Sequence, residues 1–328
     1  MRKSPTKKYT AEEKLREDIK DGGITLVLGS GINGKILPDW KKLLSLAKKS
    51  MEKTVPGKET DVLSLMRSFE QLGYRNLGEY TATKVFVKKF KQALYKCYKD
   101  NPGKAKTLKA IANVLFEDTL SECPKIRRVI TFNVDSLLEE SILLRNRNQG
   151  SDDSRVTLHP ITQWYQAAMH HTPSIDIYHL HGFLPSSQYK EEAPKLIGFQ
   201  ETPDGLIFGD DQYWDMTSRP SSLPNVIMLN ALHDSHCVFI GLSMKDPNIA
   251  RWLALRANEI KASKWAQSGG RADHLGDLLT RHYWFQAKPD PLTKVWLKSR
   301  GVRTIALKKW DDFEEVFKSV FKETDSKK

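Results

Sequence analysis

A short apolar run that ends at two closely spaced glycines constrains the fold of this chain more than any other feature. Residues 24–28, ITLVL, form a partly β-branched stretch of strand length, and Gly29-Ser30-Gly31 follows it directly. Glycines at this point allow a tight turn and expose consecutive backbone N–H groups, a common way to hold a phosphate beside a helix start. The same turn also occurs in α/β proteins that bind no nucleotide, so its interpretation depends on the motifs downstream.

Short apolar runs alternate with helical patterns along the rest of the chain. We expect strands at residues 127–132, 176–181, 195–199, 236–241 and 302–307. Apolar residues at helical spacing predict helices at 10–20, 134–145, 223–234, 246–265 and 310–323. This alternation predicts an α/β fold, with a Rossmann-like, mostly parallel sheet and helices on both of its faces.

The helical patterns also suggest how the chain is divided. Residues 60–118 are mostly helical in pattern, so we expect a small helical module, at about 55–120, inserted into the α/β domain. The predicted boundaries are an N-terminal helical extension at 1–20, the Rossmann-like domain at 21–325 and a charged tail at 326–328. An exposed loop is expected at 263–275.

Composition excludes several classes of protein. No apolar run approaches the length of a membrane span, and the basic N-terminus lacks the apolar segment of a signal peptide. Cys97, Cys123 and Cys237 stand far apart in the sequence, so neither a disulfide framework nor a Cys-x-x-Cys metal pair is expected. These features predict a cytoplasmic protein without membrane association.

Positive charge is concentrated in one part of the chain. The net charge is +12, and residues 41–110 hold 17 Lys or Arg against 6 Asp or Glu. This segment could be a surface for nucleic acid or an acidic protein. A solvated, lysine-rich helical face is the favoured interpretation, because arginine and interleaved aromatic residues are few.

Polar residues follow the predicted strand at 127–132. In the sequence Thr131-Phe132-Asn133-Val134-Asp135, the residues Asn133 and Asp135 point to the same side of an extended segment. Ligands of parallel sheets bind at the carboxyl ends of strands, which is where these side chains are expected. Asp135 is as well explained as the cap of the following helix.

Two histidines and a glycine end the next predicted strand. His179 and His181 in the sequence Tyr178-His179-Leu180-His181-Gly182 would share a face of that strand. Histidines at such positions are often structural, and no nearby carboxylate or cysteine completes a zinc site. His181 stands beside the glycine at the carboxyl end, so it is the better candidate for a base with a pKa near neutrality.

A fourth motif combines a strand end with a helix start. In the sequence Phe239-Ile240-Gly241-Leu242-Ser243, Gly241 and Ser243 could approach a ribose or a phosphate. Asp246 is most simply the cap of a helix that begins at Pro247. Lys245 replaces the second glycine of a nucleophile elbow, so Ser243 is not a nucleophile of that kind.

Taken in order, these motifs resemble the sirtuin-like domain, in the zinc-free branch found in bacterial antiphage-defence proteins. The matching pieces, GSGIN with PDWKKLL, ITFNVDSLLEE, YHLHG, IFGDDQYWDM and FIGLSMKDPNI, span about residues 20–255. The resemblance implies a Rossmann-like sheet with a helical small module, and NAD as the ligand. Its usual glycine turn is Gly-Ala-Gly followed by a residue and Ser, whereas Ser30 and Asn33 stand at those positions here.

The resemblance also implies roles for single residues. Asn133 and His181 would form the catalytic pair, with Asp135 helping to hold the nicotinamide end. The cofactor-binding residues would be Gly29, Ser30, Gly31 and Asn33 near the pyrophosphate, with Gly241 and Ser243 on the adenosine side.

The implied activity is hydrolysis of NAD. Sirtuin deacylases carry a four-cysteine zinc ribbon, which three isolated cysteines cannot build, so no zinc is expected and cleavage by water is favoured. The resemblance implies an NAD nucleosidase that depletes NAD in antiphage defence, forms a homo-oligomer and is triggered by a partner such as a DNA-translocase ATPase or an Argonaute-type protein. The alternatives are a non-catalytic module that senses NAD or ADP-ribose, a zinc-free protein deacylase and a nucleic-acid-binding module.

Overall fold

The computed structural model describes most of the chain outside its lysine-rich segment. The described residues are 9–34, 36–37, 42, 45, 88, 90–96, 105–148, 156–162, 173–193, 205–206, 218–244, 246–267 and 280–321. The predicted strand at 195–199 and most of the predicted helical module lie outside these residues. None of the helices in the described part of the chain combines the length and apolar character needed to cross a membrane.

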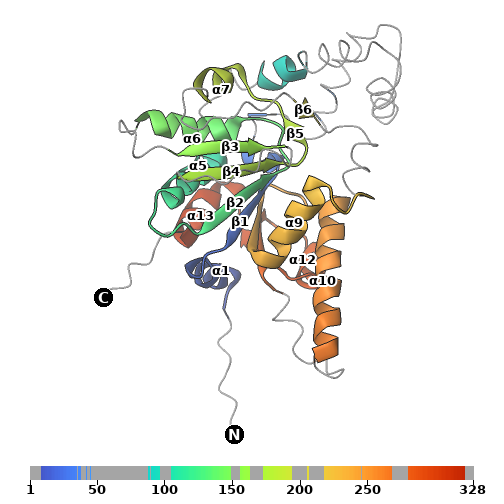
Figure 1. The fold of residues 1–328 in the computed structure, drawn as a ribbon. Helices are drawn as coiled ribbons and strands as arrows, with labels where there is room; N and C mark the ends of the chain where they lie inside the picture. Colours follow the sequence, from blue (N-terminus) through green and yellow to red (C-terminus); the bar gives the residue numbers. More distant parts are fainter. Residues whose placement is uncertain are drawn as a thin grey trace, which may run out of the picture.

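Among the described residues, seven parallel strands form one sheet in the order β3-β4-β2-β1-β7-β8-β9 (Figure 1). Their bounds are β1 Ile24–Leu28, β2 Ile126–Thr131, β3 Thr157–Ile161, β4 Ser174–His179, β7 His236–Ile240, β8 His282–Ala287 and β9 Val302–Leu307. A short antiparallel pair joins β5 (Gly182–Phe183) to β6 (Gly205–Leu206). The predicted α/β, Rossmann-like fold class is confirmed.

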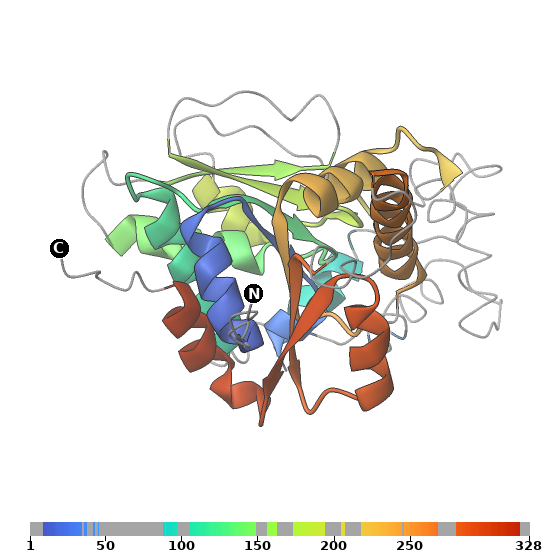
Figure 2. The same cartoon turned by 90° about the horizontal axis from the view of Figure 1, so that it is seen from below.

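Helices cover both faces of the sheet, as the two views in Figures 1 and 2 show. One face packs against α1 (Ala11–Lys20), α5 (Lys106–Thr119), α6 (Leu137–Asn148) and α13 (Phe313–Phe321). The other face packs against α9 (Leu223–Asp234), α10 (Pro247–Gln267) and α12 (Pro291–Lys298). The remaining described helices are η1 (Ser30–Asn33), α7 (Ser187–Glu192) and η5 (Trp310–Asp312).

The central strand shows why both faces must be covered. Every residue of β1 is buried, with Leu26 and Leu28 in the core under α5 and Val27 in the core under α9 and α10. A strand buried on both faces has no solvent side, so its sequence is a continuous apolar run instead of an alternating one. The apolar run at 24–28 therefore belongs at the centre of the sheet.

Helix α1 begins where its sequence predicts. Thr10 accepts a hydrogen bond from the Glu13 N–H, and the Glu13 carboxylate accepts one from the Thr10 N–H, which completes a capping box. Leu15 is fully buried in the core shared with the sheet. The domain boundaries at 20 and 325, and the helical module at about 55–120, stay predictions, although α5 at the end of that range packs against α6, α13 and β2.

Two strands of the seven-stranded sheet, β3 and β8, were not expected from the sequence. β3 contains Pro160, which argues against a strand, but β3 lies at one edge of the sheet, where a missing N–H donor is tolerated. β8 is rich in aromatic residues, and its Tyr283 and Trp284 enter opposite cores. The loop predicted at 263–275 is wrong at its start, since α10 extends through Gln267.

Candidate functional site

Four loops meet at the carboxyl edge of the sheet. Leu28, the last residue of β1, pairs with Thr131 at the end of β2 and with Ile240 at the end of β7. Thr131 in turn pairs with His179, the last residue of β4. The residues that follow these strands therefore start at the same level, and they include every site residue predicted from the sequence.

The order of the strands also marks this place for a ligand. From β1 the chain crosses to β2 on one side, whereas β7 lies on the other side of β1. Such a reversal opens a crevice beyond the carboxyl ends of the strands, where doubly wound α/β proteins bind their ligands. The turn after β1 and the turn after β7 lie at this switch point.

Close packing of these two turns explains their glycines. A Cβ on Gly31 would lie 2.8 Å from the Gly241 Cα, and one on Gly29 would lie 2.4 Å from the Leu242 side chain. Gly241 has φ of +69°, and a Cβ there would lie 2.6 Å from the Ile32 nitrogen. Any side chain at these three positions would force the turns apart.

Backbone hydrogen bonds tie the same two turns together. The N–H groups of Gly29 and Gly31 donate to the carbonyl oxygens of Ile240 and Gly241, at 3.0 Å in both cases. Because the N–H groups of Gly29 and Gly31 already donate within the fold, fewer donors of the glycine turn are left for the predicted contacts with a pyrophosphate. Ser30 and Ser243 are exposed at the rim of the two turns, where hydroxyl groups can meet a ligand.

Asn33, Asn133 and Asp135 form a buried group below the glycine turn. The Asn33 amide donates to Asp135 Oδ2 at 2.8 Å, although 102 positions separate the two residues. The Asn133 amide donates to the Gly29 carbonyl at 3.4 Å, and the Asn133 N–H donates to Thr131 Oγ1 at 3.0 Å. Asn33 thus joins the glycine turn to the 132–136 loop, and its Oδ1 accepts no hydrogen bond within the described residues.

Burial changes the acidity of the carboxyl groups here. It raises the pKa of Asp135 to about 6, although hydrogen bonds from the Leu137 N–H and Asn33 act in the opposite direction. Burial likewise raises the pKa of Glu140 on α6 to about 7, against hydrogen bonds to Ser186 and Ser136. Raised pKa values of buried groups beside a ligand crevice are typical of functional sites.

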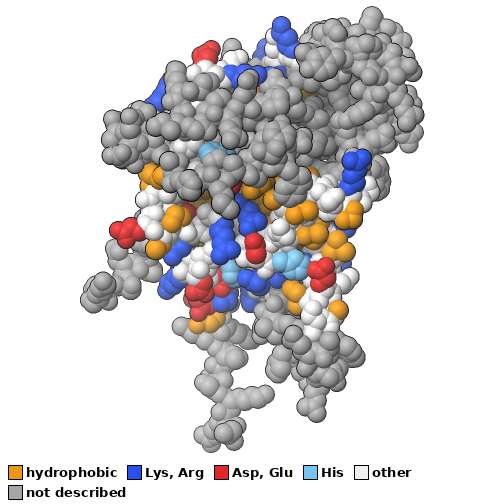
Figure 3. Space-filling model, in the orientation of Figure 1, with side chains coloured by type: hydrophobic (Ala, Val, Ile, Leu, Met, Phe, Trp, Pro, Cys, Tyr) orange, Lys and Arg blue, Asp and Glu red, His pale blue; other side chains and the backbone are white. Residues whose placement is uncertain are grey.

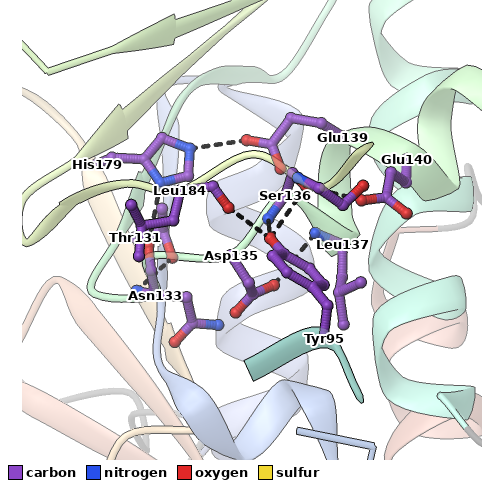
Figure 4. Close-up of polar contacts among 11 residues, drawn as sticks. Tyr95, Thr131, Asn133, Asp135, Ser136, Leu137, Glu139, Glu140, His179 and Leu184 are labelled. Atoms are coloured by element: carbon purple, nitrogen blue, oxygen red, sulfur yellow. Dashed lines mark hydrogen bonds and ion pairs between the residues drawn. The ribbon is translucent and has the colours of Figure 1, made fainter. Parts of the chain in front are cut away.

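Tyr95 fixes the end of the 132–136 loop (Figure 4). Its hydroxyl accepts from the Ser136 N–H at 2.9 Å and donates to the Leu184 carbonyl at 2.6 Å. The Ser136 hydroxyl donates to Glu140 Oε1 at 2.7 Å and accepts from the Ser186 N–H. The helical patterning of residues 60–118 predicts a helix around Tyr95, but not this contact.

His179 is buried beside the same loop, and its partner Glu139 was not identified from the sequence. His179 Nδ1 lies 3.0 Å from the Asn133 carbonyl oxygen, and Nε2 lies 2.7 Å from Glu139 Oε1. Glu139 stands on α6, one turn after Asp135. The sequence offered one signal for Glu139, its position four residues after Asp135 near the start of a helix. This spacing does not predict that both carboxyl groups are buried.

His181 lies in the loop after β4, with its ring edge-on to Phe132 at a centroid distance of 5.2 Å. Burial lowers the pKa of His181 to about 4, and the carboxylate of Asp246 opposes this shift. The expected pKa near neutrality is therefore wrong for the protein without ligand, because desolvation disfavours the charged imidazolium. His181 is neutral at pH 7 and able to accept a proton.

The start of α10 lies at the same edge of the sheet, after the turn that follows β7. Asp246 Oδ1 accepts from the Asn248 N–H at 2.7 Å, as expected of a helix cap. Just before it, the buried Met244 has a left-handed backbone with φ of 58°, which is rare for a residue with a side chain. Such strain concentrates at functional sites.

A metal site is not found within the described residues, where no group of three or more His, Cys, Asp or Glu is placed to hold an ion. Cys123 is exposed and Cys237 is buried in the core beneath α9 and α10. In the described part of the face seen in Figure 3, positive and negative side chains are intermixed. Most of the lysine-rich segment at 41–110 lies outside the described residues.

This chain is similar to proteins of one known family. The family model of the SIR2-like domain matches residues 127–305, from β2 to β9 and more than half of the chain. A crystal structure described as a Sir2 homolog–NAD complex aligns with 94% of this chain and 93% of that chain, at 14% sequence identity and a TM-score of 0.40. No curated protein matches the sequence. On the extent of the family match, the chain belongs to the SIR2-like domain family.

Proposed function

We propose that this protein is an NAD hydrolase, which cleaves NAD with water to release nicotinamide, ADP-ribose and a proton. One observation carries the proposal. In a SIR2-like domain, the buried Asn133 and Asp135 and the buried His181 stand on adjacent loops at the ligand crevice, next to the glycine turn.

In this proposal the exposed rim and the buried floor hold different parts of NAD. The pyrophosphate lies against Ser30 and the adenosine side against Gly241 and Ser243, at the rim of the two turns. The nicotinamide end enters toward Asp135 and Asn33, both less than a tenth exposed. The Oδ1 of Asn33, which accepts no hydrogen bond within the described part of the chain, is a suitable acceptor for the carboxamide N–H of nicotinamide.

The first step, the departure of nicotinamide, needs little catalytic help from the protein. Breaking the N-glycosidic bond gives an oxocarbenium-like ribose, and nicotinamide leaves as a neutral molecule because its ring was cationic, so no strong acid is needed. Asn133 would orient the ribose and the attacking water. Water becomes strongly acidic as it bonds to the electron-poor carbon, so even a base of pKa about 4, such as His181, can take its proton.

The role in the cell is a second part of the proposal, and it rests on the resemblance to antiphage-defence proteins. An NAD hydrolase without control would poison its own cell. We therefore propose an NAD-depleting effector of the cytoplasm, which works as a homo-oligomer and is triggered by a partner such as a DNA-translocase ATPase or an Argonaute-type protein. NAD levels in phage-infected cells that carry wild type or Asn133→Ala, with and without the neighbouring gene product, test this role.

The activity itself is tested by measuring free nicotinamide after the purified chain is incubated with NAD, alone and with that partner. We expect Asn133→Ala and His181→Ala each to lower turnover by at least about 100-fold, the usual contribution of a positioned acid or base. Asn148→Ala and His233→Ala, both exposed and outside the carboxyl edge, are matched controls expected to keep wild-type turnover.

Three outcomes decide between the alternatives. Undiminished turnover in both folded site variants would contradict the assignment of Asn133 and His181. NAD or ADP-ribose binding by wild type without any turnover would favour a sensing module. NAD-dependent removal of an acyl group from a peptide would favour a zinc-free deacylase.

A further inference from the structure

We propose that His179 and Glu139 share a proton and thereby position Asn133, the residue to which the proposed function assigns the ribose and the water. The proposal rests on that function for its kinetic part only. It begins from a buried titratable pair which the proposed hydrolysis does not itself use.

The partners of His179 determine how many protons the pair holds. Nδ1 faces a backbone carbonyl, which can only accept a hydrogen bond, and Nε2 faces a carboxylate oxygen at 2.7 Å. A neutral imidazole has one N–H and cannot donate to both. Either His179 is doubly protonated beside an ionised Glu139, or a protonated Glu139 donates to Nε2.

Both arrangements contain the same number of protons and leave the pair electrically neutral. Both also place a hydrogen on Nδ1, directed at the Asn133 carbonyl. Without the shared proton, an ionised Glu139 would draw the single N–H of His179 to Nε2, because a hydrogen bond to a carboxylate is the stronger one. The Asn133 carbonyl would then face a ring lone pair.

The surroundings favour the neutral pair. The His179 side chain is 1% exposed and that of Glu139 is not exposed at all. Glu139 Oε2 accepts no hydrogen bond within the described residues, and the carboxyl groups of Asp135 and Glu140 are close enough to interact with Glu139. An extra negative charge in this cluster would be costly.

The contact acts on Asn133 through its backbone. The 132–136 loop is held at Thr131 by the Asn133 N–H, at Leu184 by the Val134 carbonyl and at Tyr95 by the Ser136 N–H. His179 holds the Asn133 carbonyl itself, and Phe183 packs on the His179 ring at a centroid distance of 4.4 Å. The His179–Glu139 pair is therefore a positioning device for Asn133.

Two amide substitutions separate positioning from simple packing. In His179→Asn the amide nitrogen can take the place of Nδ1 and donate to the Asn133 carbonyl. In His179→Gln it can take the place of Nε2, which keeps the contact with Glu139 and loses the contact with Asn133. Glu139→Gln imitates a protonated Glu139, because its amide can donate to Nε2 and leave the single N–H of His179 on Nδ1, so it should retain most of the wild-type kcat.

We expect kcat to fall by about 10- to 100-fold in His179→Gln, with KM for NAD within about threefold of wild type, since misplacement by about 1 Å can cost about 100-fold. His179→Asn should retain most of the wild-type kcat. His282→Asn is the matched control. His282 is also fully buried, but it is the first residue of β8 and so lies at the amino ends of the strands, away from the candidate site. It should keep wild-type kcat per folded molecule, and thermal unfolding gives the folded fraction of each variant.

Equal kcat in His179→Asn and His179→Gln, or wild-type kcat in both, would overturn the positioning role. The shared proton is tested without NAD, by NMR of the protein with ¹⁵N-labelled histidine, with His179 assigned by comparison with its variants. We expect a protonated Nδ1, and an unprotonated Nδ1 would overturn the proposal. If wild type releases no nicotinamide, the proposed function fails, while the NMR result still decides whether the pair holds the shared proton.

Discussion

At the amino edge of the sheet, Asp18 is buried against charged and hydroxyl donors, whereas at the carboxyl edge Asp135 is buried against neutral ones. Burial alone would raise the pKa of Asp18, but hydrogen bonds from His236, Tyr283 and Lys14 outweigh it and lower this pKa to about 2. The pKa of Asp135 is instead raised to about 6. At the amino edge, the hydrogen bonds of Asp18 hold α1 on the sheet. At the carboxyl edge, the buried Asp135 carboxyl group is costly to ionise.

The glycines of the two edges differ in the same way. Gly22, which follows α1, has φ of +72°, and a Cβ there would come no closer than 3.9 Å to Lys125. Gly241 has a similar φ of +69°, but its Cβ would meet backbone atoms at 2.6 and 2.8 Å. At the amino edge glycine is needed for its backbone angle alone, and at the carboxyl edge also for the close approach of two turns.

The largest effect is therefore expected from Gly241→Ala. It should lower the free energy of unfolding by about 3 kcal/mol or more, because overpacking against backbone adds to the strain of a positive φ. Gly22→Ala, which introduces the strain alone, should cost about 1 kcal/mol. Urea unfolding of both variants measures the difference, and equal losses would show that the two turns can separate without cost.

Local features of the fold could be predicted from the sequence. The capping box of Thr10 and Glu13, the central position of β1 and the glycine turns all follow from residues close together in the chain. β3 escaped prediction because Pro160 is acceptable only at a sheet edge, and the place of a strand in a sheet is set by distant residues.

The candidate site could be predicted only in part, for a related reason. The motifs identify Asn133, Asp135 and His181, and the order of the strands brings their loops together. The hydrogen bond from Asn33 to Asp135 and the lowered pKa of His181 depend on contacts and burial that arise once the sheet has formed. Residue type alone therefore gave the wrong pKa for His181.

A second prediction compares the two carboxylates as pH changes. A carboxyl group with a raised pKa in the folded state binds its proton more tightly there, so its stabilising effect is lost as pH rises through that pKa. The free energy of unfolding of Asp135→Asn should therefore increase relative to wild type by about 2 kcal/mol between pH 4 and pH 8. Urea unfolding at several pH values provides the measurement.

Asp18→Asn is the control for this experiment, with the opposite sign. A carboxyl group whose pKa is lowered in the folded state stabilises the fold at pH values above its unfolded pKa of about 4. This stabilisation is lost only as pH falls toward the folded pKa of about 2. Asp18→Asn should therefore be less stable than wild type by about 2 kcal/mol, nearly constant between pH 4 and pH 8. Parallel pH dependences in the two variants would mean that the edges do not differ in this respect.

The smallest effect is expected from Tyr95→Phe, at the carboxyl edge. Loss of the hydroxyl leaves the Ser136 N–H and the Leu184 carbonyl without their partner in a buried place, which costs about 1 to 2 kcal/mol. Tyr189→Phe is a close match, because Tyr189 is 3% exposed and its hydroxyl makes no hydrogen bond within the described residues. Its stability should equal that of wild type or exceed it slightly. If both variants lose the same stability, the Tyr95 hydroxyl contributes through packing alone, and the 132–136 loop is held without it.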